Sequence, residues 1–125
     1  MRQTLVLGIG NLLLGDEGVG VHAARLLQDE RLPEGVTVLD GGTGGFHLLS
    51  CFSDYDEVVI IDASQDGLPP GTVRLLSPRY PSDFPRTLTA HDVGLRDLVE
   101  AAALTGTLPP VRLVAVSIAA DQPMD

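Results

Sequence analysis

The feature that most constrains the fold is a short apolar segment that runs directly into a glycine-rich turn near the start of the chain. Residues 5–9 read Leu-Val-Leu-Gly-Ile, and residues 15–20 read Gly-Asp-Glu-Gly-Val-Gly. A strand that is apolar on both faces is tolerated only in a sheet covered on both sides. A glycine-rich turn after such a strand is typical of nucleotide-binding α/β folds. We therefore expect an α/β fold with its functional edge at the carboxyl end of this strand.

Two acids in this turn argue against a nucleotide site. A phosphate loop depends on glycines and on the partial positive charge of the following helix N-terminus, whereas Asp16 and Glu17 give the turn the wrong charge. Leu13 stands where G-x-G-x-x-G needs its third glycine, and no G-K-[ST] is present. Asp40 occupies the place of a ribose-binding acid, but this partial fingerprint is weak. An electropositive turn that holds carboxylates favours a bound cation or acid-base chemistry.

The rest of the chain alternates apolar segments of strand length with amphipathic stretches of helical length. This pattern predicts one domain over residues 1–125, a three-layer αβα sandwich around a mostly parallel, twisted sheet of about five strands. The expected strands cover residues 4–9, 36–39, 58–61, 72–76 and 111–116. The expected helices cover residues 19–32, 46–52 and 91–105, and residues 78–85 form a surface loop.

Composition limits the partners and the compartment. The formal net charge is −9, with 17 acids against eight basic residues that are all arginine, so we expect no nucleic-acid partner. No apolar run approaches the roughly 20 residues of a membrane span, and the N-terminus lacks the pattern of a signal peptide. We therefore expect a cytoplasmic protein with no membrane partner. The single cysteine, Cys51, rules out an intrachain disulfide. The oligomeric state has no signature in the sequence.

Ionisable residues follow the expected strands. Asp62 comes directly after the apolar residues 58–61, and Asp40 follows residues 36–39. Because parallel strands place their carboxyl ends on one edge, we expect Asp16, Glu17, Asp40 and Asp62 to converge there. Their simpler interpretations are local: Asp62 would cap a loop, and Glu17 would be an acid in the first turn of a helix.

His91 lies near the start of an expected helix, whereas His22 and His47 are interpreted as ordinary exposed or packed residues. A Glu, an Asp and a neutral imidazole can hold a divalent cation with coordination positions left open. Without a metal, two neighbouring carboxylates could instead share a proton as a catalytic dyad. The residues alone leave both alternatives open.

Four motifs in order resemble those of the nickel-iron hydrogenase maturation endopeptidases. They are G-I-G-N-x-L-x-x-D-E-G-x-G at residues 8–20, D-G-G-T-x-G at 40–45, I-D-A at 61–63 and T-A-H-D-x-G-L at 89–95. The resemblance extends from Leu5 to about Ile118. It implies an endopeptidase, aspartic-type or metal-assisted, that removes the C-terminal extension of the hydrogenase large-subunit precursor after nickel insertion.

The resemblance also implies roles for particular residues. Glu17, Asp62 and His91 would be the catalytic residues and would bind the nickel, which the precursor carries and for which other divalent cations can substitute. Asp16 and Asp40 would support the loop or engage substrate, together with Gly41, Gly42 and Thr43. The family continues past the last strand with a covering helix that this sequence lacks, so we expect a C-terminally truncated domain. The alternative function is a non-catalytic, nickel-sensing chaperone or scaffold for the precursor.

Overall fold

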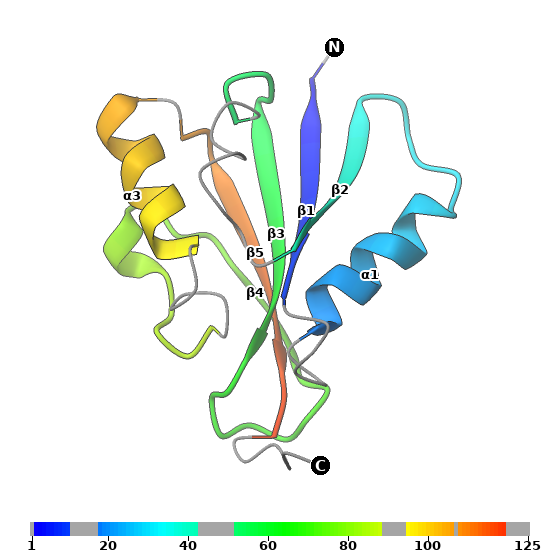
Figure 1. Ribbon diagram of the computed structural model, residues 1–125, viewed down its shortest axis with the longest axis vertical. Helices are drawn as coiled ribbons and strands as arrows, with labels where there is room; N and C mark the ends of the chain where they lie inside the picture. The colour runs from blue at the N-terminus through cyan, green and yellow to red at the C-terminus, as the bar shows by residue number, and fades with distance from the viewer. Residues whose placement is uncertain (1, 11–17, 43–51, 89–94, 107, 120–125) are drawn as a thin grey trace.

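A five-stranded sheet lies between helices in the computed structural model, which describes residues 2–10, 18–42, 52–88, 95–106 and 108–119. The strand order is β2-β1-β3-β5-β4, with the first four parallel and β4 antiparallel to β5. Helix α1 covers one face and α3 the other (Figure 1). This confirms the predicted three-layer α/β architecture. The strands are β1 (Thr4–Ile9), β2 (Val36–Gly42), β3 (Glu57–Ser64), β4 (Val73–Leu76) and β5 (Val111–Ser117). The helices are α1 (Val19–Gln28), α3 (Leu95–Thr105) and the short 3-10 helix η3 (Pro81–Asp83).

The expected strand boundaries are correct at β1 and too short at β2 and β3. Strand β3 does not end before Asp62: its ladder with β5 continues through Asp62↔Ala115 to Ser64↔Ser117. Strand β2 likewise continues past Asp40 to Gly42. In both strands, pairing with a neighbour carries the backbone beyond the point where the apolar run stops. Asp40 and Asp62 are therefore strand residues rather than loop residues.

The helices differ from expectation at their ends. Helix α1 ends at Gln28, four residues before the predicted end, where the N–H groups of Asp29 and Glu30 bond the carbonyls of Leu26 and Leu27. These tight turns satisfy the last carbonyls before Pro33 is reached. Within the expected surface loop 78–85, Pro81–Asp83 form a short 3-10 helix. Residues 46–51 and 91–94 of the other two expected helices lie outside the described part of the chain.

The main hydrophobic core lies between the sheet and α3. Side chains that alternate along β1, β3 and β5 point to this side and are almost completely buried, because α3 and the segments beside it cover them. They are Leu5, Leu7, Ile9, Val58, Ile60, Val111, Leu113 and Ala115, packed with Phe52, Phe84, Leu88, Val99 and Ala102. The sequence pattern of these strands thus places the core on one defined face.

The opposite face is covered unevenly. Helix α1 packs on β1, β2 and β3. On the same face of β5, Arg112 is exposed, and Val114 and Val116 are half-buried. On β4, Val73 and Leu75 are 62% and 65% exposed. Within the described residues, β5 is therefore fully buried on the α3 side only. None of the helices in the described ranges is long and apolar enough to cross a membrane.

Two glycines set how closely α1 approaches the sheet. A Cβ atom on Gly20 would lie 2.2 Å from the carbonyl oxygens of Ile9 and Ile61, and one on Gly8 would lie 2.1 Å from the carbonyl oxygen of Gly20. These contacts are with backbone, which cannot move aside like the end of a flexible side chain. The first turn of α1 is therefore held against the carboxyl-terminal halves of β1 and β3.

We predict that Gly20→Ala lowers the free energy of unfolding by about 3 kcal/mol, because α1 must move away from β1 and β3 to admit the methyl group. Urea denaturation followed by circular dichroism measures this change. Glu30→Ala, an exposed substitution just past the same helix, should change the value by less than about 0.5 kcal/mol. Equal stability of the two variants would contradict the close-packing interpretation.

Candidate functional site

Three described segments meet at the carboxyl-terminal halves of the central strands. The first turn of α1 reaches them through Gly20, which lies against the carbonyl of Ile61. Strand β3 contributes Asp62. The third segment, residues 84–88, is attached where Leu88 forms an isolated antiparallel bridge with Ser64. The fold thus brings together parts of the chain that are far apart in the sequence.

Asp62 is the functional candidate that the structure describes most fully. Its side chain is completely buried on the α3 side of the sheet, at the register position of Ala115. One carboxylate oxygen, Oδ1, accepts a 2.8 Å hydrogen bond from the N–H of Ala63. Burial of a carboxylate is costly unless polar groups or cations compensate it. Asp62 therefore does not cap a surface loop, because it is a buried residue within strand β3.

The segment before the histidine motif is fixed close to Asp62. Besides the bridge to Ser64, the N–H of Gln65 donates to the carbonyl of Thr87 at 2.9 Å, and Ser64 Oγ bonds Thr87 Oγ1 at 2.7 Å. Leu88 therefore pairs with Ser64, which is two residues after Asp62 in β3. The predicted site residues Asp16, Glu17, Thr43 and His91 lie outside the described residues. Within the described ranges, no group of three or more His, Cys, Asp or Glu side chains is arranged to hold a metal ion.

Asp40 and Asp62 do not converge. Asp40 pairs with Gly8, and a Cβ atom on Gly8 would point toward α1. Asp40 therefore lies on the α1 side of the sheet. There its Oδ2 accepts a 3.2 Å bond from Arg25 Nε of α1. Both side chains are partly exposed, so the ion pair adds little stability. Both acids lie at the same carboxyl-terminal edge, as expected, because Gly8 pairs with Asp40 on one side and with Ile61 on the other. Their side chains nevertheless project from opposite faces of the sheet.

The glycines after Asp40 pack closely at the end of β2. Gly42 pairs with Ile9, and a bulge between Gly8 and Ile9 leaves Gly41 without a register partner. A Cβ on Gly41 would lie 2.8 Å from Leu7 Cδ1, so a side chain there would press into the core. Backbone at this point can therefore approach the neighbouring strand closely.

A hollow of about 340 Å³ also lies at the carboxyl-terminal edge of the sheet, beside the end of β5. Its lining residues are Val19, Pro70, Gly71, Val116, Ser117 and Ile118.

A buried polar network links the end of β3 to β4 and β5, and the sequence pattern did not reveal it. Asp66 Oδ2 accepts hydrogen bonds from Arg74 Nη2 and Ser117 Oγ, each at 3.0 Å, and Oδ1 accepts one from the N–H of Leu68 at 3.1 Å. The Asp66 side chain is only 7% exposed. In the sequence, Asp66 stands in a glycine- and proline-rich turn, and the pairing of β4 with β5 that places Arg74 beside it is long-range information.

The network sets the charge state of Asp66. Burial alone would raise its pKa, but the hydrogen bonds from Leu68 and Ser117 and the positive charge of Arg74 outweigh burial and lower the pKa below its ordinary value of 3.8. The folded state therefore stabilises the ionised carboxylate. This contribution to stability is complete above pH 3.8 and is lost as the pH falls through the lower pKa of the folded state.

We predict that Asp66→Asn lowers the free energy of unfolding by about 1–3 kcal/mol at pH 7, because the amide cannot satisfy Arg74 and Ser117 as the carboxylate does. The difference from wild type should shrink below pH 3.8, where the wild-type carboxyl becomes protonated. Chemical denaturation at a series of pH values measures both effects. Asp54→Asn, at an exposed position, is the control and should follow wild type throughout. A difference for Asp66→Asn that stays constant with pH would contradict the assigned charge state.

Comparisons with known proteins agree with this architecture. A family model described as hydrogenase maturation protease matches residues 21–123. The hydrogenase expression/formation protein HupM of Azotobacter chroococcum mcd 1 is 39% identical over 110 residues, which cover 84% of this chain and 52% of that protein. The hydrogenase 2 maturation protease of Escherichia coli (strain K12) is 38% identical over 110 residues, 86% of this chain and 67% of that protein.

Solved structures give the same result. The hydrogenase maturating endopeptidase HybD from E. coli superposes with a TM-score of 0.79 at 39% identity, covering 94% of this chain and 74% of that one. The chain spans about half the length of HupM and of its counterpart HoxM from Azotobacter vinelandii. The family match, the sequence identities and the shared fold place this chain in the hydrogenase maturation protease family.

Proposed function

We propose that this protein cleaves the C-terminal extension from the precursor of a nickel-iron hydrogenase large subunit after nickel has been inserted. The proposed recognition group is Glu17, Asp62 and His91, which would bind the nickel carried by the precursor. The observation that carries the proposal is the fully buried carboxylate of Asp62, in the part of β3 that meets the first turn of α1 at Ile61 and the Leu88 segment at Ser64.

Chain connectivity supports this set of three residues. Glu17 is bonded to Gly18, which precedes the turn that Gly20 holds against β1 and β3. His91 follows Leu88 by three residues, a reach of at most about 11 Å for an extended chain, and Leu88 is paired beside Ser64. The described neighbours of both residues thus lie beside the part of β3 that contains Asp62, which supports the proposed set.

The chemistry of the set suits a cation that arrives with the substrate. Two carboxylates and an imidazole neutralise a divalent cation and leave coordination positions for the precursor. The nickel can then polarise the scissile carbonyl or lower the pKa of an attacking water. A proton-sharing pair of Glu17 and Asp62 is the aspartic-type alternative, and it needs no metal for catalysis. In either case selection of the processed precursor depends on the metal.

The neighbouring residues are proposed to serve the substrate. The Arg25–Asp40 pair links the end of β2 to α1. From there Gly41, Gly42 and Thr43 would lie along the segment to be cut, with Asp16 on the other side. The small volume of Gly41 and Gly42 allows backbone to approach backbone. The hollow of about 340 Å³ beside Val19 gives room for a peptide at this edge.

We predict that Glu17→Gln, Asp62→Asn and His91→Ala each reduce precursor processing by about 100-fold or more while the fold is retained. Each change removes the charge or the ligand atom, and Glu17→Gln and Asp62→Asn also keep the size of the side chain. Processing is measured from the mass of the precursor C-terminus, and folding by circular dichroism. The matched controls are Glu30→Gln, Asp54→Asn and His22→Ala, all at exposed positions, and they should process normally. Normal cleavage by all three site variants would refute the proposed site.

A second prediction concerns the metal. Incubation of the wild-type protein with nickel-loaded precursor should release the C-terminal peptide, and incubation with nickel-free precursor should release none. Mass spectrometry of the products reads both results. Equal cleavage of the two precursors would eliminate recognition through nickel. Binding of the loaded precursor without any peptide release would instead identify a nickel-sensing chaperone or scaffold.

A further inference from the structure

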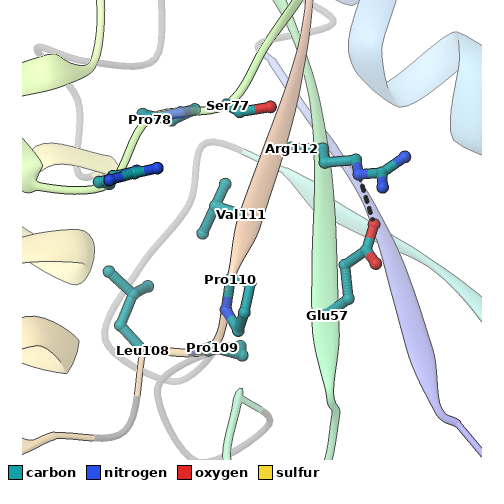
Figure 2. A pocket seen from close by; sticks show the side chains of 9 residues that line it. Glu57, Ser77, Pro78, Leu108, Pro109, Pro110, Val111 and Arg112 are labelled. Carbon is teal, nitrogen blue, oxygen red and sulfur yellow. Dashed lines mark ion pairs between the residues drawn. The ribbon is translucent and has the colours of Figure 1, made fainter.

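A larger hollow lies at the opposite edge of the sheet, where β3 and β5 begin. It has a volume of about 510 Å³, and its lining includes Pro78, Arg79, Leu108, Pro110 and Val111 (Figure 2). Glu57 and Val111 open their strands, whereas Asp62 is five residues further along β3, or about 16 Å at the usual rise per residue. The hollow is therefore separate from the proposed nickel site.

The hollow forms where β4 separates from β5. Their ladder ends at Leu76↔Leu113, and two residues further Pro78 stands where a partner for Val111 would be. Proline has no N–H to donate, so it cannot continue the ladder. Pro110 and Ser117 show toward which neighbour the backbone groups of each position along β5 point. The carbonyl of Pro110 points to β3, where it accepts a hydrogen bond from the N–H of Val58. The N–H and carbonyl of Ser117 point to the β4 side, where they bond the carbonyl of Thr72 and the N–H of Gly71.

This alternation directs the backbone groups of Val111 toward the hollow. Backbone groups alternate between the two sides of a strand, so Val111, at an odd position like Ser117, presents its N–H and C=O on the β4 side. The ladder with β4 has already ended there. An extended peptide laid in the hollow could bond to both groups, as in recognition by strand addition.

The charge of the hollow is positive. Both oxygens of Glu57 are held, Oε2 by Arg2 Nη2 at 2.7 Å and Oε1 by Arg112 Nε at 3.0 Å. Figure 2 shows the Glu57–Arg112 pair across β5 from Leu108 and Pro78. Arg79 lines the hollow and is exposed, and within the described residues its guanidinium has no acidic partner. The nearby Asp83 uses its Oδ2 to accept from the backbone N–H groups of Arg79 and Tyr80.

The remaining wall is apolar and continues into a second hollow. Leu108 and Pro109 line both the first hollow and a neighbouring one of about 280 Å³, which also contacts Phe52 and Tyr55. The two hollows are neighbours that share Leu108 and Pro109, and we call the surface that they form together the Leu108 groove. It offers backbone groups at one point, a guanidinium at one end and apolar surface along its length.

We propose that the Leu108 groove binds an extended segment of the hydrogenase precursor in which acidic and large apolar side chains alternate. The inference rests on the proposed function, because it assigns a second contact with the same substrate. Metal recognition is common to every nickel-loaded precursor, so a contact remote from the nickel can distinguish one precursor from another. In a chain of net charge −9, a positively charged groove also gives an acidic segment a defined place to bind.

The experiment uses a fluorescein-labelled peptide of alternating leucine and glutamate as the probe, with the leucine-lysine peptide as its counterpart. Fluorescence anisotropy measures binding to the whole chain. We expect Arg79→Glu to weaken binding of the acidic probe at least tenfold, because it replaces attraction with repulsion. Arg31→Glu is the matched control: Arg31 is exposed, lacks an ion pair among the described residues and follows α1 on the other face of the sheet. It should change binding less than twofold.

Further arms separate this inference from the proposed function. Asp62→Asn should bind the acidic probe like wild type although it does not process precursor. Arg79→Glu should raise the KM for nickel-loaded precursor and leave kcat unchanged. The inference is overturned if Arg79→Glu and Arg31→Glu bind the acidic probe equally, or if the lysine probe binds wild type as tightly as the acidic probe. Those outcomes leave the test of the nickel site unaffected.

Discussion

The contact of α1 with β1 and β3 depends on two positions without side chains. Gly8 and Gly20 bring helix backbone within contact of strand backbone, and a single methyl group at either position would push the two apart. Because α1 starts here, its first turn and the carboxyl-terminal halves of β1 and β3 form one rigid unit. The third segment, ending at Leu88, is added to this unit through Ser64. The described part of the candidate site is thus positioned by paired strands and by the first turn of a helix.

Two buried acids in this region have contrasting environments. Asp66 is surrounded by donors that fix it in the ionised state, with Arg74 as a permanent cation. Asp62 lies deeper, on the face that carries the hydrophobic core, with the N–H of Ala63 on one oxygen. An acid with a permanent counter-charge has little remaining capacity to bind a cation. The proposed division of roles follows: Asp66 maintains the structure, and Asp62 belongs to the proposed nickel site.

Local patterns in the sequence predict the elements, and long-range pairing determines the rest. The apolar run at Thr4–Ile9 identifies β1 correctly, and the alternation of apolar segments with amphipathic stretches predicts a sheet of about five strands. The depth of Asp62 was not predictable, because the apolar run stops before it while the ladder with β5 continues. The placement of Asp40 on the α1 side depends on a register of pairing with β1, which the spacing of residues 36–40 does not contain. The Asp66 network required knowledge that β4 and β5 are neighbours.

The position of β4 has a consequence for motion. This edge strand is paired on one side only, it is four residues long, and two of its side chains are mostly exposed, so it belongs to the least protected part of the sheet. When β4 separates from β5, Arg74 leaves Asp66, and the constraint on Ser117 is weakened in the same event. Hydrogen exchange in β4 would therefore report on an opening that also loosens the end of β3. Fraying of β4 and loss of the Asp66 ion pair are therefore coupled through Arg74.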